Sequence, residues 1–315
     1  MRASSHRLSI SLLDLGIVAP GQDGAQVLQQ TLRLAQLADR LGYDRLWLSE
    51  HHEAHFCWTG PEVVLATLAR TTSRIGLGSA AVLLPLYSPL AVAETYRTLA
   101  ALSDGRVALG VCAGVPADPV ALAALMESGI DAGSASRLFA DKLAELVRYL
   151  DGDFAPGHRF ARGATPCFAE APPLWLMGSG ARSAEMAAAA GAGYAFSLFH
   201  RASTQDAAIP RAYRDRAQGR DGAQLAVALS CVCADTDAAA QAQRAQVESW
   251  IGGTMRVNIA GTPQACHQQI LAACEKHGAQ AAIVYQMWHL EERRRDALVA
   301  LAELFALPAA GADHG

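Results

Sequence analysis

Residues 44–79 read DRLWLSEHHEAHFCWTGPEVVLATLARTTSRIGLGS, and their pattern decides the fold. Two short apolar runs, 44–49 and 74–79, flank a helical pattern at 61–72. Pro61 suits the start of that helix, because the first turn leaves its N–H groups unpaired. The apolar runs do not alternate with polar residues, which is typical of strands buried on both faces of a parallel sheet. The stretch therefore predicts a strand, a helix and a second, parallel strand.

The same unit recurs along the rest of the chain. Strands are predicted at residues 8–13, 44–49, 74–79, 106–111, 174–177, 194–198, 225–233 and 280–285. Helices are predicted at residues 25–41, 61–72, 89–102, 134–150, 181–190, 204–217, 238–250, 263–277 and 290–304. Eight strand–helix units in about 300 residues is the count of a (β/α)8 barrel, also called a TIM barrel. A doubly wound open sheet is the alternative, because a count of strands does not show that they close.

No linker rich in Gly, Ser or Pro divides the chain, so residues 1–315 are expected to form a single domain. Within it, residues 8–305 are the expected ordered core and residues 309–315 the expected flexible tail. Between the seventh and eighth predicted strands lie two helical stretches in place of one, which indicates an insertion. Thr262 and Pro263 suit the start of the second stretch, and Gly278 suits its end.

The composition excludes several classes of protein. Of 315 residues, 51% are hydrophobic and only 18% are charged, which is the opposite of a disordered chain. Lys and Arg number 26 against 30 Asp and Glu, so there is no basic excess to neutralise a nucleic-acid backbone. No window reaches 18 uncharged apolar residues, so no membrane span is expected. Seven cysteines without a CxxC pair indicate reduced thiols, and a cytoplasmic protein is expected.

Titratable residues cluster after the second predicted strand, and the carboxyl ends of the strands are where barrel enzymes carry their chemistry. The cluster comprises Glu50, His51, His52, Glu53 and His55. Imidazoles titrate near neutrality and suit general acid–base work. Taken singly, each histidine more often has a structural role, but a cluster at a barrel mouth favours function. The His52–His55 spacing is one residue short of the HExxH pattern, so no metal site is expected.

Glycine-rich segments follow two other strands. Residues 76–81, GLGSAA, imitate a dinucleotide fingerprint, but the apolar run continues to Pro85 with no helix, so a conventional NAD site is rejected. Their small side chains would allow a flat ligand to approach the backbone. Residues 178–183, GSGARS, open a predicted helix and form a candidate anion site. An ordinary glycine loop with a serine cap explains the second segment equally well.

Three further residues are weaker candidates. Cys112, after the fourth strand, is either a buried thiol or the neighbour of a cofactor. Phe56 and Trp58, beyond the histidines, either line an apolar substrate pocket or pack in the core.

Together these motifs resemble the bacterial luciferase-like flavin monooxygenases over about residues 8–305. The segments that carry the resemblance are 46–52 (LWLSEHH), 74–85 (RIGLGSAAVLLP), 88–89 (SP), 93–94 (AE), 104–110 (DGRVALG), 178–183 (GSGARS) and 261–263 (GTP).

The resemblance implies a fold, a reaction and partners. The fold would be a (β/α)8 barrel that forms a homodimer through helices of the N-terminal half. A separate reductase would supply FMN as FMNH2, and O2 would add at flavin C4a to give a hydroperoxide that oxygenates an organic small molecule. Aldehydes, aromatic polyketides, amines and carrier-bound molecules all remain open as substrates. The alternatives are an F420-dependent hydride-transfer enzyme and a non-catalytic flavin-binding protein of the same fold.

The resemblance also assigns roles by position. His51 would be the catalytic acid–base, Ala80 and Ala81 would form a non-proline cis peptide under the isoalloxazine, and Cys112 would lie near the flavin ring. The implied cofactor-binding residues are Glu50, Ala80, Ala81, Cys112, Gly178, Ser179, Gly180, Ala181 and Ser183. The expected substrate-side residues are His52, Phe56 and Trp58.

The sequence departs from the family pattern in two places. Ala113 stands where the family often has an arginine for the flavin phosphate, and Arg182 is a candidate to replace it. Residues 235–261 are short where luciferases carry a long mobile loop, so light emission is not expected.

Overall fold

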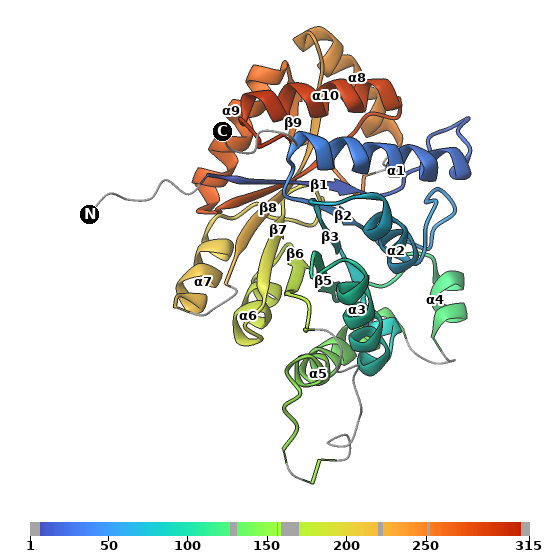
Figure 1. Ribbon diagram of the computed structural model, residues 1–315, viewed down its shortest axis with the longest axis vertical. Coiled ribbons are helices and arrows are strands. Elements are labelled where there is room, and N and C mark those ends of the chain that lie inside the picture. The colour runs from blue at the N-terminus through green and yellow to red at the C-terminus, as the bar shows by residue number, and fades with distance from the viewer. Residues whose placement is uncertain are drawn as a thin grey trace.

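The predicted strands form a closed ring surrounded by helices in the computed structural model shown in Figure 1. The structure describes residues 7–126, 131–155, 157–158, 170–219, 223–250 and 253–309. The strands are β1 (Ser9–Asp14), β2 (Arg45–Leu48), β3 (Gly76–Ser79), β4 (Val82–Leu83), β5 (Val107–Cys112), β6 (Leu174–Gly178), β7 (Gly193–Ser197), β8 (Leu225–Cys233), β9 (Ile259–Gly261) and β10 (Ala281–Gln286). The order β10-β1-β2-β3-β5-β6-β7-β8 is closed by the pairing of β8 with β10, and every pair is parallel. The barrel prediction is therefore confirmed, and the open doubly wound sheet is excluded.

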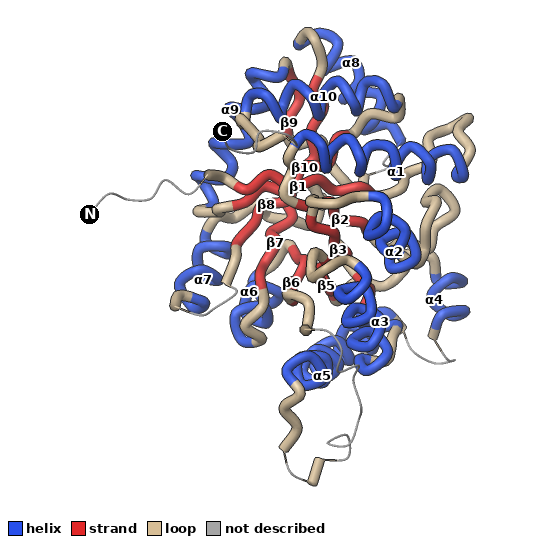
Figure 2. Tube along the Cα trace, viewed as in Figure 1, coloured by secondary structure: helices blue, strands red, loops and turns tan. Residues whose placement is uncertain are grey.

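The helices lie outside the strands, as Figure 2 shows in blue and red. They are α1 (Gly24–Leu41), α2 (Pro61–Thr71), α3 (Pro89–Leu102), α4 (Pro119–Leu125), α5 (Ala132–Asp151), α6 (Ala181–Ala189), α7 (Ala208–Ala217), α8 (Asp237–Trp250), α9 (Pro263–His277) and α10 (Glu291–Leu304). Gly42 and Gly278 end α1 and α9 in the left-handed conformation, and the Thr262 side chain caps α9. These caps agree with the sequence prediction. Among the described helices, none combines the length and the hydropathy needed to cross a membrane.

Several short elements escaped the sequence prediction. They are β4, β9, α4 and a 3-10 turn at Leu84–Leu86. The helix predicted at 204–217 begins only at Ala208, because Gln205 has a φ of 56° and the Asp206 carboxylate accepts the N–H of Ala208. Between β8 and β10 lie α8, β9 and α9, with β9 paired to β8. Residues 310–315 of the expected tail lie outside the described residues.

Aromatic side chains and glycines fill the inside of the barrel. Trp47 and Trp175 meet edge to face with ring centroids 5.5 Å apart. A Cβ on Gly78 would lie 2.5 Å from the Trp47 ring, and one on Gly193 would lie 2.6 Å from the Trp175 ring. Glycine is required at both positions because real side chains essentially never approach so closely.

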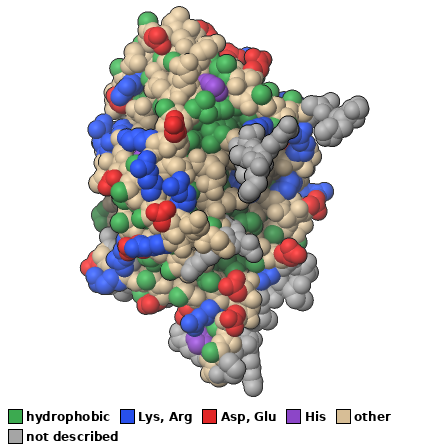
Figure 3. All heavy atoms as spheres, turned by 90° about the vertical axis from the view of Figure 1, so that its left-hand side faces the viewer, with side chains coloured by type: hydrophobic (Ala, Val, Ile, Leu, Met, Phe, Trp, Pro, Cys, Tyr) green, Lys and Arg blue, Asp and Glu red, His purple; other side chains and the backbone are tan. Residues whose placement is uncertain are grey.

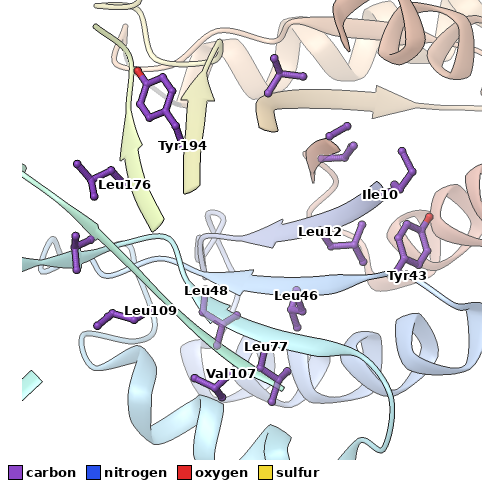
Figure 4. Close-up of a cluster of buried hydrophobic side chains, with 14 of the residues drawn as sticks. Ile10, Leu12, Tyr43, Leu46, Leu48, Leu77, Val107, Leu109, Leu176 and Tyr194 are labelled. Atoms are coloured by element: carbon purple, nitrogen blue, oxygen red, sulfur yellow. The ribbon is translucent and has the colours of Figure 1, made fainter. Parts of the chain in front are cut away.

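Aliphatic residues pack between the strands and the helices. Figure 4 shows members of this cluster, including Ile10, Leu46, Leu77 and Leu109, which are at most 4% exposed. Such closely packed apolar side chains supply most of the stability of a barrel and hold its strand ends in place.

Charged side chains of both signs are mixed on the face in Figure 3, which is the side where the chain enters β1. The strands point away from this face, so their carboxyl ends, and the site described next, lie on the opposite side of the molecule.

Candidate active site at the carboxyl ends of the strands

A cavity of about 1110 Å³ opens at the carboxyl ends of the strands. Its walls are mostly apolar, with a few polar side chains concentrated after β2, β6 and β7. Of the predicted site residues, those that line the cavity are Glu50, His51, His52, Phe56, Ala80, Ala81, Cys112, Gly178, Ser179, Gly180 and Ser183. Segments separated by more than 100 residues in the sequence therefore contribute to a single chamber.

Glu50 is buried, and both of its carboxylate oxygens are occupied by protein donors. Oε1 accepts from the Tyr87 hydroxyl at 2.6 Å and lies 2.8 Å from Nε2 of His52. Oε2 accepts the backbone N–H of Leu83 at 2.9 Å. Burial raises the pKa of Glu50, although these hydrogen bonds oppose the shift. The geometry makes Glu50 an anchor for residues 83–87, which differs from the predicted direct contact with a cofactor.

His52 and His51 have different surroundings. Nε2 of the His52 ring is bonded to Glu50, and the side chain is only 10% exposed. The predicted contact with substrate is therefore limited to the small part of the ring that remains accessible. The His51 ring is 31% exposed and stacks on Phe56 with centroids 4.0 Å apart and planes 14° apart. His51 is thus the more accessible imidazole of the pair.

The charge of His51 is set by its surroundings. Burial lowers the pKa of His51 to about 4, and His200, His55 and His52 also lower it, while Glu53 acts in the opposite direction. Nδ1 of His51 lies 3.6 Å from Oε2 of Glu53. At neutral pH His51 is therefore a neutral imidazole, able to accept a proton beside a carboxylate that would stabilise the resulting cation.

Glu53 joins two loops at the mouth of the barrel. Its Oε1 accepts the N–H of Ala117 at 3.2 Å, and its Oε2 accepts the N–H of His52 at 3.2 Å. These backbone donors and His51 contribute to a lowered pKa of Glu53, although burial opposes them, so the group is a carboxylate at neutral pH. Glu53 was noted in the sequence only as a member of the cluster; its bond to Ala117 depends on a loop 64 residues away.

His200 is a site residue that sequence reasoning missed. It lies at the rim of the cavity just after β7, and desolvation of its ring lowers its pKa. Its ring is tilted against Phe199 with centroids 4.6 Å apart. The available signal was its position directly after the predicted strand 194–198, the same kind of position that pointed to His51.

Ala80 and Ala81 are joined by a cis peptide bond, as the resemblance predicts, and both line the cavity. The N–H of Ala80 is held by the carbonyl of Leu48 at 2.6 Å. Gly76 and Gly78 precede this pair, and the sequence suggested that such small residues let a flat ligand approach the backbone. A side chain on Gly76 would collide with Arg45, and one on Gly78 would collide with Trp47. Packing against these two side chains therefore explains both glycines.

The loop from β6 to α6 forms a cradle for an anion. Gly180 precedes the first turn of α6, its N–H donates to the Ser183 hydroxyl at 3.4 Å, and a Cβ on Gly180 would meet no atom within 4 Å. The Ser183 hydroxyl contacts the Gly180 carbonyl at 2.8 Å and the Tyr194 hydroxyl at 3.0 Å. Arg182 also lines the cavity here, while Ala113 lies on its wall without a charge. Exposed N–H groups, the helix dipole and an arginine together favour a bound phosphate.

Two predicted site residues do not line the cavity. Trp58 is 5% exposed, donates its indole N–H to the Ser49 carbonyl at 2.9 Å, and fills the space beside Gly16. The substrate contact predicted for Trp58 is therefore wrong, and core packing is its role. Ala181 opens α6 but faces away from the cavity wall, so only its backbone belongs to the cradle.

Thiols and metal ligands complete the inventory of reactive groups. Cys112 lines the cavity, and burial raises the pKa of its thiol to about 11, which keeps it protonated. Within the described ranges, no three His, Cys, Asp or Glu side chains come together as metal ligands.

Comparisons with known proteins agree with this geometry. Residues 10–309 match the family model described as luciferase-like monooxygenase. The protein YwcH of Bacillus subtilis is 36% identical over 262 residues, which is 81% of this chain and 78% of that protein. The N-acetyl-S-alkylcysteine monooxygenase of the same organism is 36% identical over 61% of this chain and 57% of its own length. The crystal structure of apo-MsnO8 has a TM-score of 0.81 and 30% identity, and covers 96% of this chain and 99% of that one.

Proposed function

Because the chain belongs to the luciferase-like monooxygenase family, we propose that it is a two-component monooxygenase that uses FMNH2 and O2 to oxygenate an organic small molecule. The observation that carries this proposal is the cavity itself. One chamber connects the glycine-rich N-terminus of α6 to a neutral imidazole, and its volume of about 1110 Å³ is large for a ligand site. That volume supports simultaneous binding of a flavin and a substrate.

The chain's own residues fit a flavin along one arc of the barrel. The cradle of Gly178, Ser179, Gly180 and Ser183, with Arg182, would hold the phosphate. Ala80 and Ala81 would present a wall of small side chains to the flat ring, with Cys112 beside them. When bound, the reduced flavin would supply the two electrons that activate O2, so that one oxygen atom enters the substrate and the other leaves as water. His51 would accept a proton from the reacting groups or return one to them. The apolar walls would exclude water.

Other features support the proposed partners. Large apolar side chains are exposed on helices of the first half of the chain, at Val63, Leu102, Val120 and Leu125, which supports a homodimer. No dinucleotide fingerprint opens a helix, which supports delivery of FMNH2 by a separate reductase. The described cysteines are all free thiols, which supports a reducing, cytoplasmic location.

The test is rapid mixing of the anaerobic protein–FMNH2 complex with oxygenated buffer while the flavin spectrum is followed. We expect an oxygenated flavin that persists longer with the protein than in free solution. Rapid reoxidation without a protein-dependent intermediate, in the presence and absence of candidate substrates, would contradict the proposal. Binding of F420 by the protein would then favour hydride transfer, and flavin binding without turnover would favour a non-catalytic protein.

A variant separates the role of His51 from flavin binding. We expect His51→Ala to bind FMNH2 normally and to lose product formation by about 10²-fold or more, the scale of general acid–base catalysis. His267→Ala, on α9 and away from the cavity, is the matched control. Unchanged product formation in His51→Ala would show that the imidazole is not the acid–base.

A further inference from the structure

The cavity has two arcs, and only one of them is used by the proposed flavin site. Around the barrel, β3, β5 and β6 separate β2 from β7 on one side, and β1, β10 and β8 separate them on the other. They therefore lie opposite each other. The cis peptide, Cys112 and the phosphate cradle belong to the β3–β5–β6 side. The remaining wall on the other side is lined by Leu13, Leu15, Ile17, Val18, Ala19, Pro20, Phe199, His200, Ala202, Ala228, Thr254, Met255 and Ile283.

This second arc offers no cation to a ligand. Among the described residues that line the whole cavity, the single Lys or Arg is Arg182, and it lies at the opposite cradle. Two arginines lie near the rim of the second arc, but both are held by backbone carbonyls. Arg201 donates to the Met255 carbonyl at 3.1 Å, and Arg256 donates to the Arg201 carbonyl at 2.7 Å and to the Ser203 carbonyl at 3.2 Å.

The ionisable groups after β2 do not favour an anionic ligand either, because Glu53 is a carboxylate and His51 carries no compensating positive charge at neutral pH. The Glu50 oxygens are occupied by Tyr87, His52 and Leu83, and those of Glu53 by backbone N–H groups and His51. His51 is neutral at pH 7 because burial and its neighbours lower its pKa. A charged substrate in this arc would be desolvated without a counter-ion, which is costly in a mostly apolar chamber.

Flat rings lie at both ends of the second arc. After β2, Phe56 stacks on His51 with centroids 4.0 Å apart and is tilted by 38° against His55 at 4.4 Å. Phe199 and His200, with centroids 4.6 Å apart, follow β7 on the opposite side. His200 also lowers the pKa of His51. A planar ligand between these two groups would meet ring faces at each end and an imidazole nitrogen for one hydrogen bond.

We propose, on the basis of the function proposed above, that the second arc selects an uncharged substrate with an aromatic or conjugated ring system and one hydroxyl or carbonyl group placed against His51 or His200. No Lys or Arg side chain of the described residues lines the second arc, which selects against carboxylate and phosphate substrates, and the ring pairs select a planar body over a flexible alkyl chain.

The test uses two probes of the same size that differ in charge, 2-naphthol and 2-naphthoate, at neutral pH. Each is titrated by calorimetry into the protein already saturated with oxidised FMN. We expect 2-naphthol to bind at least tenfold more tightly than 2-naphthoate without displacing FMN. Phe199→Ala should weaken the binding of 2-naphthol by about tenfold and leave the affinity for FMN unchanged.

A designed cation provides the converse measurement. Ala202 lines the second arc and is exposed at its rim, so Ala202→Arg can place a guanidinium there. We expect this variant to bind 2-naphthoate about tenfold more tightly than the parent, with 2-naphthol unchanged.

The outcomes separate this inference from the proposed function. Equal or tighter binding of 2-naphthoate by the parent protein, or displacement of FMN by 2-naphthol, would overturn the inference and leave the flavin site intact. Absence of any binding by 2-naphthol to the FMN-loaded protein would overturn it as well. Failure of FMNH2 to bind to the anaerobic protein would refute the proposed function, and the inference that rests on it would be refuted as well.

Discussion

At the scale of single residues, Glu53 is the neighbour that raises the pKa of His51. Glu53 is the carboxylate at 3.6 Å from Nδ1, and it opposes the lowering of the His51 pKa by burial. Phe56 fixes the plane of the ring by stacking. The sequence motif HHE thus places the His51 imidazole and the carboxylate that raises its pKa two residues apart.

Replacing Glu53 is therefore expected to change the acidity of His51. In Glu53→Gln the pKa of His51 should fall below its value of about 4, because the one group that raises it is neutralised. Imidazole NMR resonances followed against pH measure this shift. If His51 is the base, the acid limb of the turnover profile should move to lower pH in the same variant.

Two controls distinguish positioning from loop structure. Glu292→Gln, exposed on α10, should leave the His51 titration unchanged. Glu53 also binds the N–H of Ala117, so a Glu53→Gln variant that melts earlier but titrates normally at His51 would mean that the carboxylate only joins the two loops.

At the scale of elements, a buried ion pair joins the first strand to the last helix. Asp14, at the end of β1, accepts from Arg294 of α10 and from Thr31 of α1, each at 2.8 Å, and from the N–H of Gly16 at 3.0 Å. The side chains of Arg294 and Asp14 are 13% and 4% exposed. Asp14 raises the pKa of Arg294 against the effect of burial.

Breaking this pair should cost much more than breaking a surface pair beside it. We expect Arg294→Met to lower the free energy of unfolding by about 3–5 kcal/mol, because it leaves a buried carboxylate without its cation. The adjacent Arg293 pairs with Asp235 at exposures of 47% and 82%, so Arg293→Met should cost less than about 1 kcal/mol. Urea unfolding of both variants makes the comparison. If both variants lost a similar free energy of unfolding, the buried pair would stabilise the fold no more than the surface pair does.

Element boundaries also explain where prediction from sequence succeeded. Helices α3 and α9 begin and end at the predicted residues, because Pro89, Pro263 and Gly278 mark their ends locally. The strands β4 and β9 are two and three residues long and were not predicted. Such short runs have no periodicity of their own and exist because β5 and β8 offer them a partner.

At the scale of the whole molecule, the site makes stability depend on pH. The folded-state pKa of His51 lies below the usual value of about 6.5, so the native protein binds fewer protons than the unfolded chain between those values. The contribution of this group is fully present above about pH 6.5 and is lost as the pH falls toward 4.

We therefore expect the urea midpoint to fall between pH 7 and pH 4.5, and to fall less steeply in His51→Gln, which has no proton to bind. Equilibrium unfolding at a series of pH values in both proteins tests this. Parallel curves for the two proteins would mean that His51 titrates normally in the folded state.

By itself, the sequence determined the number and order of the strand–helix units, most of their ends, and the residues with reactive side chains after each strand. These features depend on side-chain periodicity, caps and turn residues, which act over a few positions of the chain. His51 and the Gly178–Ser183 segment were found this way, whereas the cis peptide between Ala80 and Ala81 was expected only from the family resemblance.

Only the tertiary structure decided how these pieces meet. Closure depends on hydrogen bonds between β8 and β10 and between β10 and β1, whose partners are up to 272 residues apart, as with Ser9 and Ala281. The same closure brings His200 across from His51, ties Glu53 to Ala117, and moves Trp58 into the core. Contacts of this kind are set by packing and desolvation between distant segments, and no local pattern records them.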